Sequence, residues 1–405
     1  MLGFLFKLLS LPILAILLAF NLRRIVLTMA AFFLPRRRPP IGANAELPTV
    51  LILVPCRDEE LVLEGLGRSL QQLIYPSDKL QIVLIDDGST DNTLPIMRQL
   101  ARENPNVHVL SLPQNVGKAN ALNAALAACS SGEIVYVVDA DHRPEPNTLL
   151  ALVRYFNTPN VAGVTGHTIV SNALASPSAY YSAVESAVHQ MITMRGKDRL
   201  DLAPALLGAN CAYRRATLVQ YGGFAPGVFL EDSDLTIRLS RAGYHLRFAE
   251  DAIAYFQVPE TRIGYLNQHA RWARGFNDVA IDHARGLIHQ SNLRPLLRLE
   301  LFLFAVGYLD RIALLGAGAL TLLSALAPRR FRFPRAILYL SLLTPFAQII
   351  ALLLEQRASA AMWLRLPLVP LFFALDVYAA VRAMFDSLLK RKRIWTRTPR
   401  STHDL

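Results

Sequence analysis

Cysteine is scarce in this chain of 405 residues, which holds only three, Cys56, Cys129 and Cys211. None of them forms a Cys-x-x-Cys pair, and an odd, sparse set excludes the disulfide framework of a small secreted domain. Such cysteine usage is typical of a reducing compartment. Because all three lie in the central part of the chain, we expect that part to be cytosolic.

Charge is also sparse, at 18% of residues, and its basic part is unevenly placed. Three clusters beside apolar runs hold fifteen of the 42 lysines and arginines, and the rest of the chain carries 27 basic against 31 acidic residues. The net charge of +11 therefore fits anionic lipid, and we expect no nucleic-acid partner. The clustered residues are Arg23, Arg24, Arg36, Arg37, Arg38, Arg329, Arg330, Arg332, Arg335, Lys390, Arg391, Lys392, Arg393, Arg397 and Arg400.

Apolar residues make up 53% of the chain and gather at its two ends. The run from Leu2 to Leu34 is followed by arginines and prolines instead of a small-residue cleavage site, which favours a membrane anchor over a signal peptide. A single crossing and a hairpin around Arg23 both remain open. We expect residues 1–38 to form the N-terminal anchor, 300–386 a C-terminal membrane region and 387–405 a basic cytosolic tail.

Within the C-terminal region, Ala336–Leu354 and Leu366–Phe385 are long enough to span a membrane. Leu301–Ala327 is interrupted by Asp310 and Arg311. The basic loop and the basic tail that flank the two spanning segments predict a cytosolic side for both. Leu301–Ala327 must then enter and leave on the same side, so we expect it to be interfacial or re-entrant.

The central part alternates short apolar runs with segments of helical periodicity, and we predict an α/β domain over residues 48–290. This order implies a parallel sheet with right-handed crossovers, in which ligands bind beyond the carboxyl ends of the strands. The predicted strands are Val50–Val54, Gln81–Ile85, Val107–Leu110 and Ile134–Val138, with Gly163–Val170 and two short strands in Arg247–Phe256 further along. The predicted helices are Glu59–Gln72, Asp91–Glu103, Lys118–Cys129, Asn147–Asn157 and Ser178–Arg195.

Two aspartates, Asp139 and Asp141, follow the strand that begins at Ile134. Residues i and i+2 of a strand point to the same side, so both carboxylates can face one small cation. We predict that the pair holds Mg²⁺ or Mn²⁺ against the diphosphate of a nucleotide-sugar. The alternative is an ordinary strand that ends in a polar turn.

Two turns at predicted helix starts are candidate nucleotide contacts. Asp86–Asp91 follows a strand and supplies acidic side chains, although an N-capped turn explains it equally well. Gly117 and Lys118 place free N–H groups and an ammonium where both can meet phosphate, the alternative being a surface lysine.

Two later segments suit the chemistry of a transfer reaction. Glu231–Asp234 lies at a helix start, where the acids either cap the helix or supply a general base. Gln268, Arg271 and Trp272 share one turn of a helix. Arg271 could neutralise a leaving phosphate and Trp272 could stack on a sugar ring, whereas the alternative is a tryptophan at a membrane interface beside lipid-facing arginines.

The ordered set of motifs resembles the signature of processive family 2 glycosyltransferases, which include cellulose, chitin, hyaluronan and poly-N-acetylglucosamine synthases. The similarity covers about Val50–Gly275, with apolar segments on both sides. It implies a GT-A (Rossmann-like) α/β fold flanked by transmembrane helices, and an inverting glycosyltransferase. The motifs are Asp87, Asp139-Ala140-Asp141, Glu231-Asp232 and Gln268-x-x-Arg271-Trp272.

Carried over by position, the resemblance implies that Asp232 is the catalytic base and that Asp139 and Asp141 serve the metal, with Asp139 also touching the ribose or diphosphate. The segment Cys56–Glu59 departs from the usual Tyr-Asn-Glu kind, which leaves the nucleotide contact of Arg57 open. The other implied substrate contacts are Pro55, Arg57 and Glu59 in the nucleotide pocket, Asp87 at the uracil, Lys118 near the uridine and diphosphate, Gln268 and Arg271 at the diphosphate, and Trp272 beneath the acceptor sugar. Glu231 is a further substrate-binding candidate.

The expected reaction moves a sugar from a UDP-sugar, UDP-N-acetylglucosamine before UDP-glucose, to a growing polysaccharide. A lipid glycosyltransferase of the ceramide-glucosyltransferase kind is the first alternative, and a non-catalytic membrane scaffold is the second. Expected partners are the UDP-sugar, a polysaccharide or lipid acceptor, membrane lipids and polysaccharide-export proteins. The expected place is a bacterial inner membrane with the catalytic domain on the cytosolic side.

Overall fold

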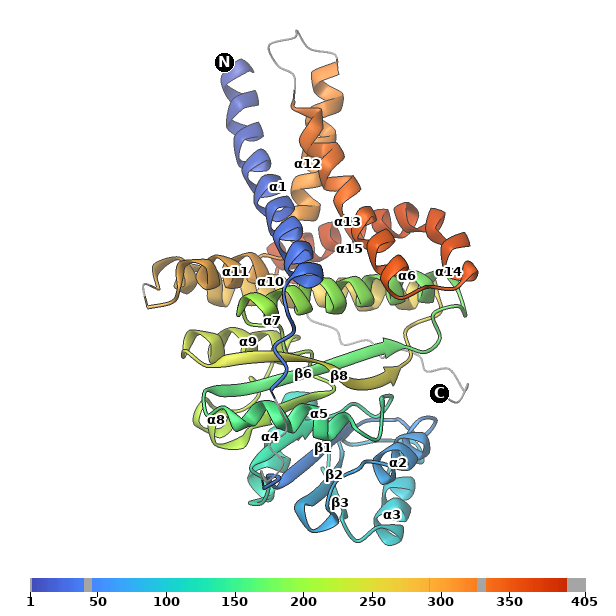
Figure 1. The fold of residues 1–405 in the computed structure, drawn as a ribbon. Helices are drawn as coiled ribbons and strands as arrows, with labels where there is room; N and C mark the ends of the chain where they lie inside the picture. Colours follow the sequence, from blue (N-terminus) through green and yellow to red (C-terminus); the bar gives the residue numbers. More distant parts are fainter. Residues whose placement is uncertain (1, 40–45, 291, 326–332, 392–405) are drawn as a thin grey trace. The chain divides into compact units, whose positions relative to one another are not determined.

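The computed structural model describes residues 2–39, 46–290, 292–325 and 333–391 (Figure 1). The chain divides into two compact units. The sheet unit contains Pro35–Ala173 and Asp201–Pro259, and the helical unit contains Met1–Leu34, Leu174–Leu200 and Glu260–Arg397. The basic residues predicted at 329–332 and beyond 391 lie outside the described residues.

The first half of the sheet is parallel, as predicted, and its strand order is β3-β2-β1-β4. Its strands are runs of apolar, mostly β-branched residues, and those of β1 and β4 are buried almost throughout, as expected for strands with both faces covered. The strands are β1 (Val50–Cys56), β2 (Leu80–Asp86), β3 (Val107–Ser111) and β4 (Ile134–Val137).

The second half of the sheet makes it a mixed one, because β7 (Cys211–Arg214) pairs antiparallel with both β4 and β6 (Val161–Val170). The order continues β7-β6-β8-β5, with β5 at Arg143–Pro144. The prediction of two short strands in Arg247–Phe256 was wrong. One long strand, β8 (His245–Phe256), runs beside β6, and its residues 250–252 leave the pairing register between Gly166 and His167.

Helices of the sheet unit cover the sheet. The buried core joins alternate residues of β1 and β2, including Ile52, Val54 and Leu84, to α2, α3 and α5. This alternation is the period of two that a strand requires. The helices are α2 (Leu63–Gln71), α3 (Thr93–Glu103), α4 (Lys118–Ala128), α5 (Thr148–Val153), α8 (Arg215–Gln220) and α9 (Glu231–Arg241).

Asn210 joins the two halves of the sheet just before β7 begins. Its side-chain oxygen accepts a hydrogen bond from the Tyr136 hydroxyl at 2.9 Å. Its amide nitrogen donates to the main-chain carbonyls of His167 at 3.2 Å and Ala252 at 2.9 Å. A fully buried amide with all these partners satisfied fixes β4, β6 and β8 around the start of β7.

The helical unit contains three stretches that are long and apolar enough to cross a membrane, Leu8–Phe33, Arg335–Glu355 and Ala360–Leu388. The pair α11 and α12 is bent by 72° and would be a fourth span if counted as one. The break, at residues 306–308, lies just before the predicted interruption at Asp310, which is itself helical, and the re-entrant topology stays a prediction. The helices are α1 (Leu2–Phe33), α6 (Pro177–Val188), α7 (Arg195–Leu200), α10 (Arg262–His289), α11 (Pro295–Ala305), α12 (Leu309–Ala325), α13 (Arg335–Glu355), α14 (Ala360–Leu364) and α15 (Val369–Leu388).

Two segments inside the range 48–290 pack with these apolar helices. Buried residues of α6 and α10, Tyr181 and Tyr265 among them, share a core with Phe372 of α15 and Leu353 of α13. A π-helical turn, His189–Met194, joins α6 to α7, and Gly196 of α7 lies so close to α1 that a Cβ there would meet the Leu27 carbonyl at 2.4 Å. Each compact unit is therefore made of several separate stretches of chain that pack together.

Gly166→Ala should destabilise the sheet unit, because a Cβ at this position would lie 2.4 Å from the Asn210 amide nitrogen and 2.5 Å from the Ala252 carbonyl. Overpacking and a lost buried hydrogen bond together cost about 2–4 kcal/mol in the free energy of unfolding. Thermal unfolding of the full chain in detergent measures the loss. Gly222→Ala is the control, since only its positive φ of 81° is strained and about 1 kcal/mol is expected. Equal losses in the two variants would contradict the role given to Asn210.

Candidate functional site

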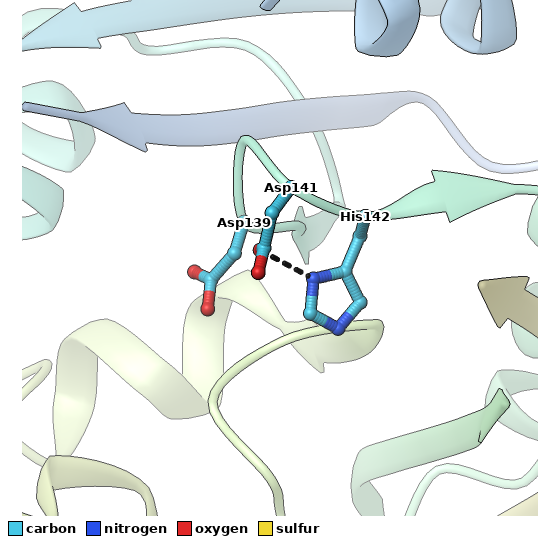
Figure 2. Close-up of side chains that lie close together, drawn as sticks. All are labelled: Asp139, Asp141 and His142. Atoms are coloured by element: carbon cyan, nitrogen blue, oxygen red, sulfur yellow. Dashed lines mark hydrogen bonds and ion pairs between the residues drawn. The ribbon is translucent and has the colours of Figure 1, made fainter. Parts of the chain in front are cut away.

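The acidic pair lies in a turn and not on a strand, because β4 ends at Val137. Strand alternation is therefore not what brings Asp139 and Asp141 together, which corrects the reason given for their common direction. Their carboxylate oxygens and a ring nitrogen of His142 nevertheless lie within 4.8 Å of one another (Figure 2). The predicted pair thus forms a cluster, with a histidine as its third member.

His142 was missed by the sequence reasoning. Its Nδ1 lies 3.0 Å from Oδ1 of Asp141, and each side chain is only 8% exposed. The imidazole ring stacks on Phe256 of β8, with centroids 5.2 Å apart and planes 8° apart. The imidazole is held in place from two sides, so it fixes the direction of the Asp141 carboxylate. A histidine directly after an acidic pair was the available signal.

Arg143, also missed, clamps the turn. Its guanidinium donates to the main-chain carbonyls of Ala140 at 3.1 Å and His142 at 3.0 Å, and to that of Val62, ahead of α2, at 2.7 Å. The close packing of Gly65 against the guanidinium leaves no room for a side chain at that glycine. The turn is therefore fastened to α2 by a charged group with several fixed hydrogen bonds.

The donor set fits a divalent cation. Two carboxylates are the ligands that Mg²⁺ and Mn²⁺ both accept, and a neighbouring imidazole adds a nitrogen ligand that suits Mn²⁺. Asp139 keeps 31% of its side chain exposed, so the cluster opens to solvent on one side. A ligand that bears phosphate could reach a metal ion held there.

Lys118 links this cluster to a second pair of acids. It is the first residue of α4, after Gly117, whose φ of 86° favours glycine. Its Nζ donates to Oδ1 of Asp139 at 2.7 Å and to the Gly208 carbonyl at 2.9 Å, and lies 3.9 Å from Oε1 of Glu231. These fixed partners argue against the alternative of a free surface lysine.

Asp232 lies next to Glu231 at the start of α9. Its Oδ1 accepts a hydrogen bond from the main-chain N–H of Ser233 at 2.6 Å, and its Oδ2 lies 3.0 Å from where a Cβ on Gly208 would be. Burial and the Glu231 carboxylate raise the pKa of Asp232 to about 7, although Lys118 opposes the rise. A carboxylate with this pKa is suited to accept a proton near neutral pH.

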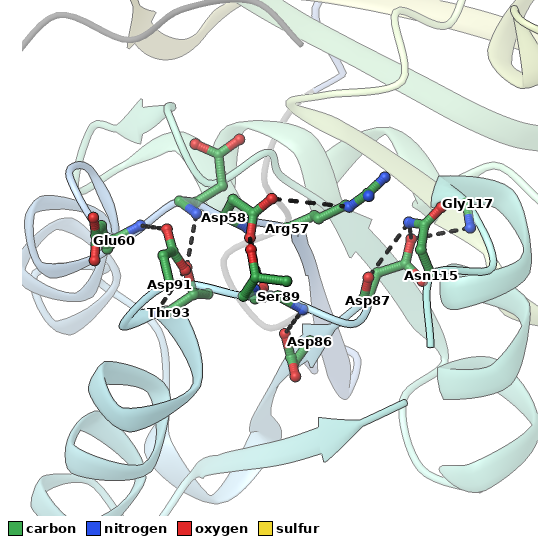
Figure 3. Close-up of polar contacts among 12 residues, drawn as sticks. Arg57, Asp58, Glu60, Asp86, Asp87, Ser89, Asp91, Thr93, Asn115 and Gly117 are labelled. Carbon is green, nitrogen blue, oxygen red and sulfur yellow. Dashed lines mark hydrogen bonds and ion pairs between the residues drawn. The ribbon is translucent and has the colours of Figure 1, made fainter. Parts of the chain in front are cut away.

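Asp87 is held by the loop that precedes α4 (Figure 3). Its carboxylate accepts hydrogen bonds from the main-chain N–H groups of Val116 at 2.7 Å and Gly117 at 3.0 Å, and from the Asn115 amide at 2.7 Å. Burial raises the pKa of Asp87, while these bonds and the charge of Arg57 oppose the rise. The contact of Asp87 with a uracil stays a prediction.

The loop after β1 carries the other predicted nucleotide contacts. Pro55 is within the strand, and Asp58 takes a left-handed φ of 53°. The main-chain N–H of Glu59 donates to the Thr93 hydroxyl at 2.7 Å, and Arg57 lies 4.0 Å from the Asp58 carboxylate. These residues form a loop, so the helix that was predicted to begin at Glu59 begins at Leu63 instead.

Gln268, Arg271 and Trp272 lie on α10 of the helical unit, as the helical spacing predicted. Trp272 makes an edge-to-face contact with His269, with ring centroids 4.9 Å apart. That these three residues form one site with Asp232 stays a prediction, because they belong to a different compact unit.

Residues 48–275 match the family described as glycosyltransferase like family 2. The chain belongs to glycosyltransferase family 2. The match covers the whole sheet unit between β1 and β8 and ends inside α10. The predicted family and class of enzyme are thereby confirmed.

Two relatives of this family 2 glycosyltransferase show how far the similarity extends. The probable glycosyltransferase YdaM of Bacillus subtilis is 32% identical over 263 residues, which are 64% of this chain and 62% of the relative. The poly-beta-1,6-N-acetyl-D-glucosamine synthase of Staphylococcus aureus is 26% identical over 246 residues, 60% of this chain and 58% of the relative. The matched part is therefore less than two thirds of the length of either relative.

A solved structure confirms the predicted fold. The mannosyltransferase PcManGT from Pyrobaculum calidifontis, in complex with GDP-Man and Mn²⁺, has a TM-score of 0.67 and 23% identity to this chain. The similarity covers 97% of this chain and 100% of PcManGT. The similarity confirms a GT-A-like fold for this chain.

The rate of sugar transfer should fall with an apparent pKa near 7 as the pH is lowered, because a base must be ionised and Asp232 is protonated below that value. Lys118→Met removes a cation that favours the ionised form, so its acid limb should move to higher pH. Glu231→Gln removes a like charge, so its limb should move to lower pH. A pH–rate profile of each variant measures both shifts.

The control for these profiles is Lys79→Met, which removes a cation that pairs with Glu46 at 2.9 Å in the same unit. Its acid limb should coincide with that of the wild type. Limbs that stay in place in both the Lys118 and the Glu231 variants would exclude Asp232 as the titrating group.

Proposed function

We propose that this family 2 glycosyltransferase transfers a sugar from a UDP-sugar to a hydroxyl group of a growing polysaccharide, with inversion, at the cytosolic face of a membrane. The observation that supports it best is the bridge made by Lys118. The Lys118 ammonium pairs with Asp139, a proposed metal ligand, and lies near Glu231, the neighbour of Asp232. Donor-side groups and a proton acceptor thus lie within reach of one another.

The leaving diphosphate carries the electrostatic difficulty, since negative charge builds on it as the glycosidic bond breaks. We assign Lys118 to this charge, with Gln268 and Arg271 from α10 as further contacts of the diphosphate. Asp139 and Asp141 would hold Mg²⁺ or Mn²⁺, which supplies positive charge to the same phosphates when bound. The proposed catalytic segment therefore extends over residues 48–290 and includes α10.

The proton chemistry belongs to Asp232. The carboxylate accepts the proton of the acceptor hydroxyl as that oxygen attacks the anomeric carbon, a role that typically contributes about 10²–10⁴-fold to the rate. The burial of Asp232 and the neighbouring Glu231 carboxylate raise its pKa to about 7, close to the pH at which the enzyme is expected to work. Inversion follows from a single displacement, which needs this one base and no covalent intermediate.

The donor pocket is assigned to Pro55, Arg57, Glu59 and Asp87, and Trp272 to the floor beneath the acceptor sugar. We propose UDP-N-acetylglucosamine as the first donor and UDP-glucose as the second. The name of the Staphylococcus aureus relative supports this order. The apolar helices of the helical unit support a place in a membrane, which we propose to be a bacterial inner membrane with lipid contacts and polysaccharide-export partners.

The donor and the product are tested together with the full chain purified in detergent. A panel of UDP-N-acetylglucosamine, UDP-glucose and GDP-mannose is supplied with Mg²⁺ or Mn²⁺, and UDP or GDP release is measured with product size. Release from UDP-N-acetylglucosamine with a ladder of long products supports the proposal. A single short lipid-linked product would assign the protein to glycolipid synthesis, and turnover of GDP-mannose alone would contradict the donor.

Two substitutions separate binding from chemistry. Asp232→Asn should leave UDP affinity within about twofold while transfer falls at least about 10²-fold, because only the proton acceptor is lost. Asp141→Ala should abolish metal-dependent UDP binding, because it removes a carboxylate ligand. Calorimetric UDP titration with and without Mn²⁺, beside turnover, measures both. Comparable turnover by the Asp232 variant would remove that residue from its role.

A further inference from the structure

A buried group of charges in the helical unit has no part in the mechanism so far. His269, one residue after Gln268 on α10, is 1% exposed, and its Nε2 lies 2.7 Å from Oε2 of Glu185 on α6. Ligand atoms of Glu185, His269 and Asp376 of α15 lie within 4.8 Å of one another. Buried ionisable groups among apolar helices are costly and are therefore candidates for a function.

The hydrogen bonds of His269 define its charge. Its Nδ1 lies 3.0 Å from the main-chain carbonyl of Tyr265, which only accepts, and its Nε2 faces the Glu185 carboxylate. The pKa of Glu185 is lowered by His269 despite burial, so this side chain is a carboxylate and only accepts. Both ring nitrogens then meet acceptors and both carry a proton, so the ring is an imidazolium. Burial opposes this charge, but Glu185 and Asp376 outweigh burial and raise the pKa of His269.

Charge balance along the network favours the same state. Arg311 of α12 donates to Asp376 at 2.9 Å and to Asp310 at 3.0 Å, and Asp310 also pairs with Arg24 of α1. These two cations and two anions compensate one another. A protonated His269 is the cation that Glu185 contacts directly, and Arg311 and His189 add weaker favourable charge. The charged and titratable groups around the imidazole are Glu185 and Tyr181 on α6, His189 after it, Tyr265 on α10, Tyr308, Arg311 on α12 and Asp376 on α15.

The imidazole also contacts Trp272. It stacks on the Tyr265 ring, with centroids 3.9 Å apart, and meets the Trp272 ring edge to face at 4.9 Å. The side chain of Trp272 is one helical turn away from His269, so a change at His269 reaches the indole directly. We propose that His269 stays protonated and, tied to Glu185, positions the face of α10 that carries Trp272 for the acceptor sugar. The proposal rests on the function assigned above to Trp272.

A charge cycle in the full chain tests this proposal. His269→Gln leaves Glu185 a buried charge without its counterion, and Glu185→Gln leaves the imidazolium without its partner, so sugar transfer by each should fall about tenfold or more. The double variant removes both charges together and should recover to within about threefold of the wild type. The loss of transfer should exceed any loss of metal-dependent UDP binding in the single variants, because the His269 ring contacts Trp272, which is assigned to the acceptor, whereas Gln268 and Arg271 are assigned to the diphosphate.

The matched control is His245→Gln, which removes a histidine that pairs with Asp201 at 2.9 Å in the sheet unit and is 38% exposed. Transfer by this variant should equal that of the wild type. A His269→Gln variant as active as the wild type, or a double variant no better than the worse single one, would overturn the proposal.

The protonation state is measured separately, by nitrogen-15 NMR of histidine-labelled protein with His269→Gln to assign the signal. Two protonated ring nitrogens at pH 7 support the proposal, and a neutral ring overturns it whatever sugar the enzyme transfers. Elemental analysis is a third test. If the wild type binds a divalent metal that the Glu185→Gln variant has lost, the group is a metal site, His269 is not protonated and the proposal is overturned. A wild type that transfers no sugar refutes the proposed function. The NMR signal, and the thermal stabilities of the two single variants and the double variant, still show in that case whether a protonated His269 is paired with Glu185.

Discussion

The site depends on one compensated repulsion. Asp139 and Asp141 follow β4, Glu231 and Asp232 begin α9, and the only ammonium shown between the two pairs in the described part of the chain is that of Lys118. Like charges this close raise each other's pKa unless a cation intervenes. The bonds of Lys118 to Asp139 and to the Gly208 carbonyl therefore hold both pairs in one place. Burial, together with the repulsion from Glu231 that Lys118 does not cancel, still raises the pKa of Asp232.

Local sequence patterns were enough to predict the parallel half of the sheet. Short apolar runs separated by helical segments predicted β1 to β4 and their parallel pairing, because a helix between successive strands makes a crossover connection. The spatial order of the four strands was not predicted. The place of β7 between β4 and β6 was not predictable in this way. It depends on Asn210 reaching Tyr136, a contact across 74 positions that no periodicity records. The bulge in β8 is likewise set by its partner strand.

The candidate site was predicted in its residue types more fully than in its geometry. Acidic residues at strand ends and at the start of α9 were readable from the sequence, because topology places ligands there. His142 and Arg143 were missed because their roles depend on a turn, and the strand was expected to continue through Val138. The charge pair of His269 was missed for a different reason, since Glu185 lies 84 positions away on another helix.

The interleaving of the two units has a consequence for how the protein is made. Each unit is assembled from separate stretches of chain, so neither is complete when its first stretch leaves the ribosome. A fragment cut at the family boundaries, 48–275, would end inside α10 and would carry α6 without the α13 and α15 residues that cover it. The sheet unit is therefore not separable as one continuous piece of chain, and its last stretch, residues 201–259, is made only after the α6–α7 segment of the helical unit.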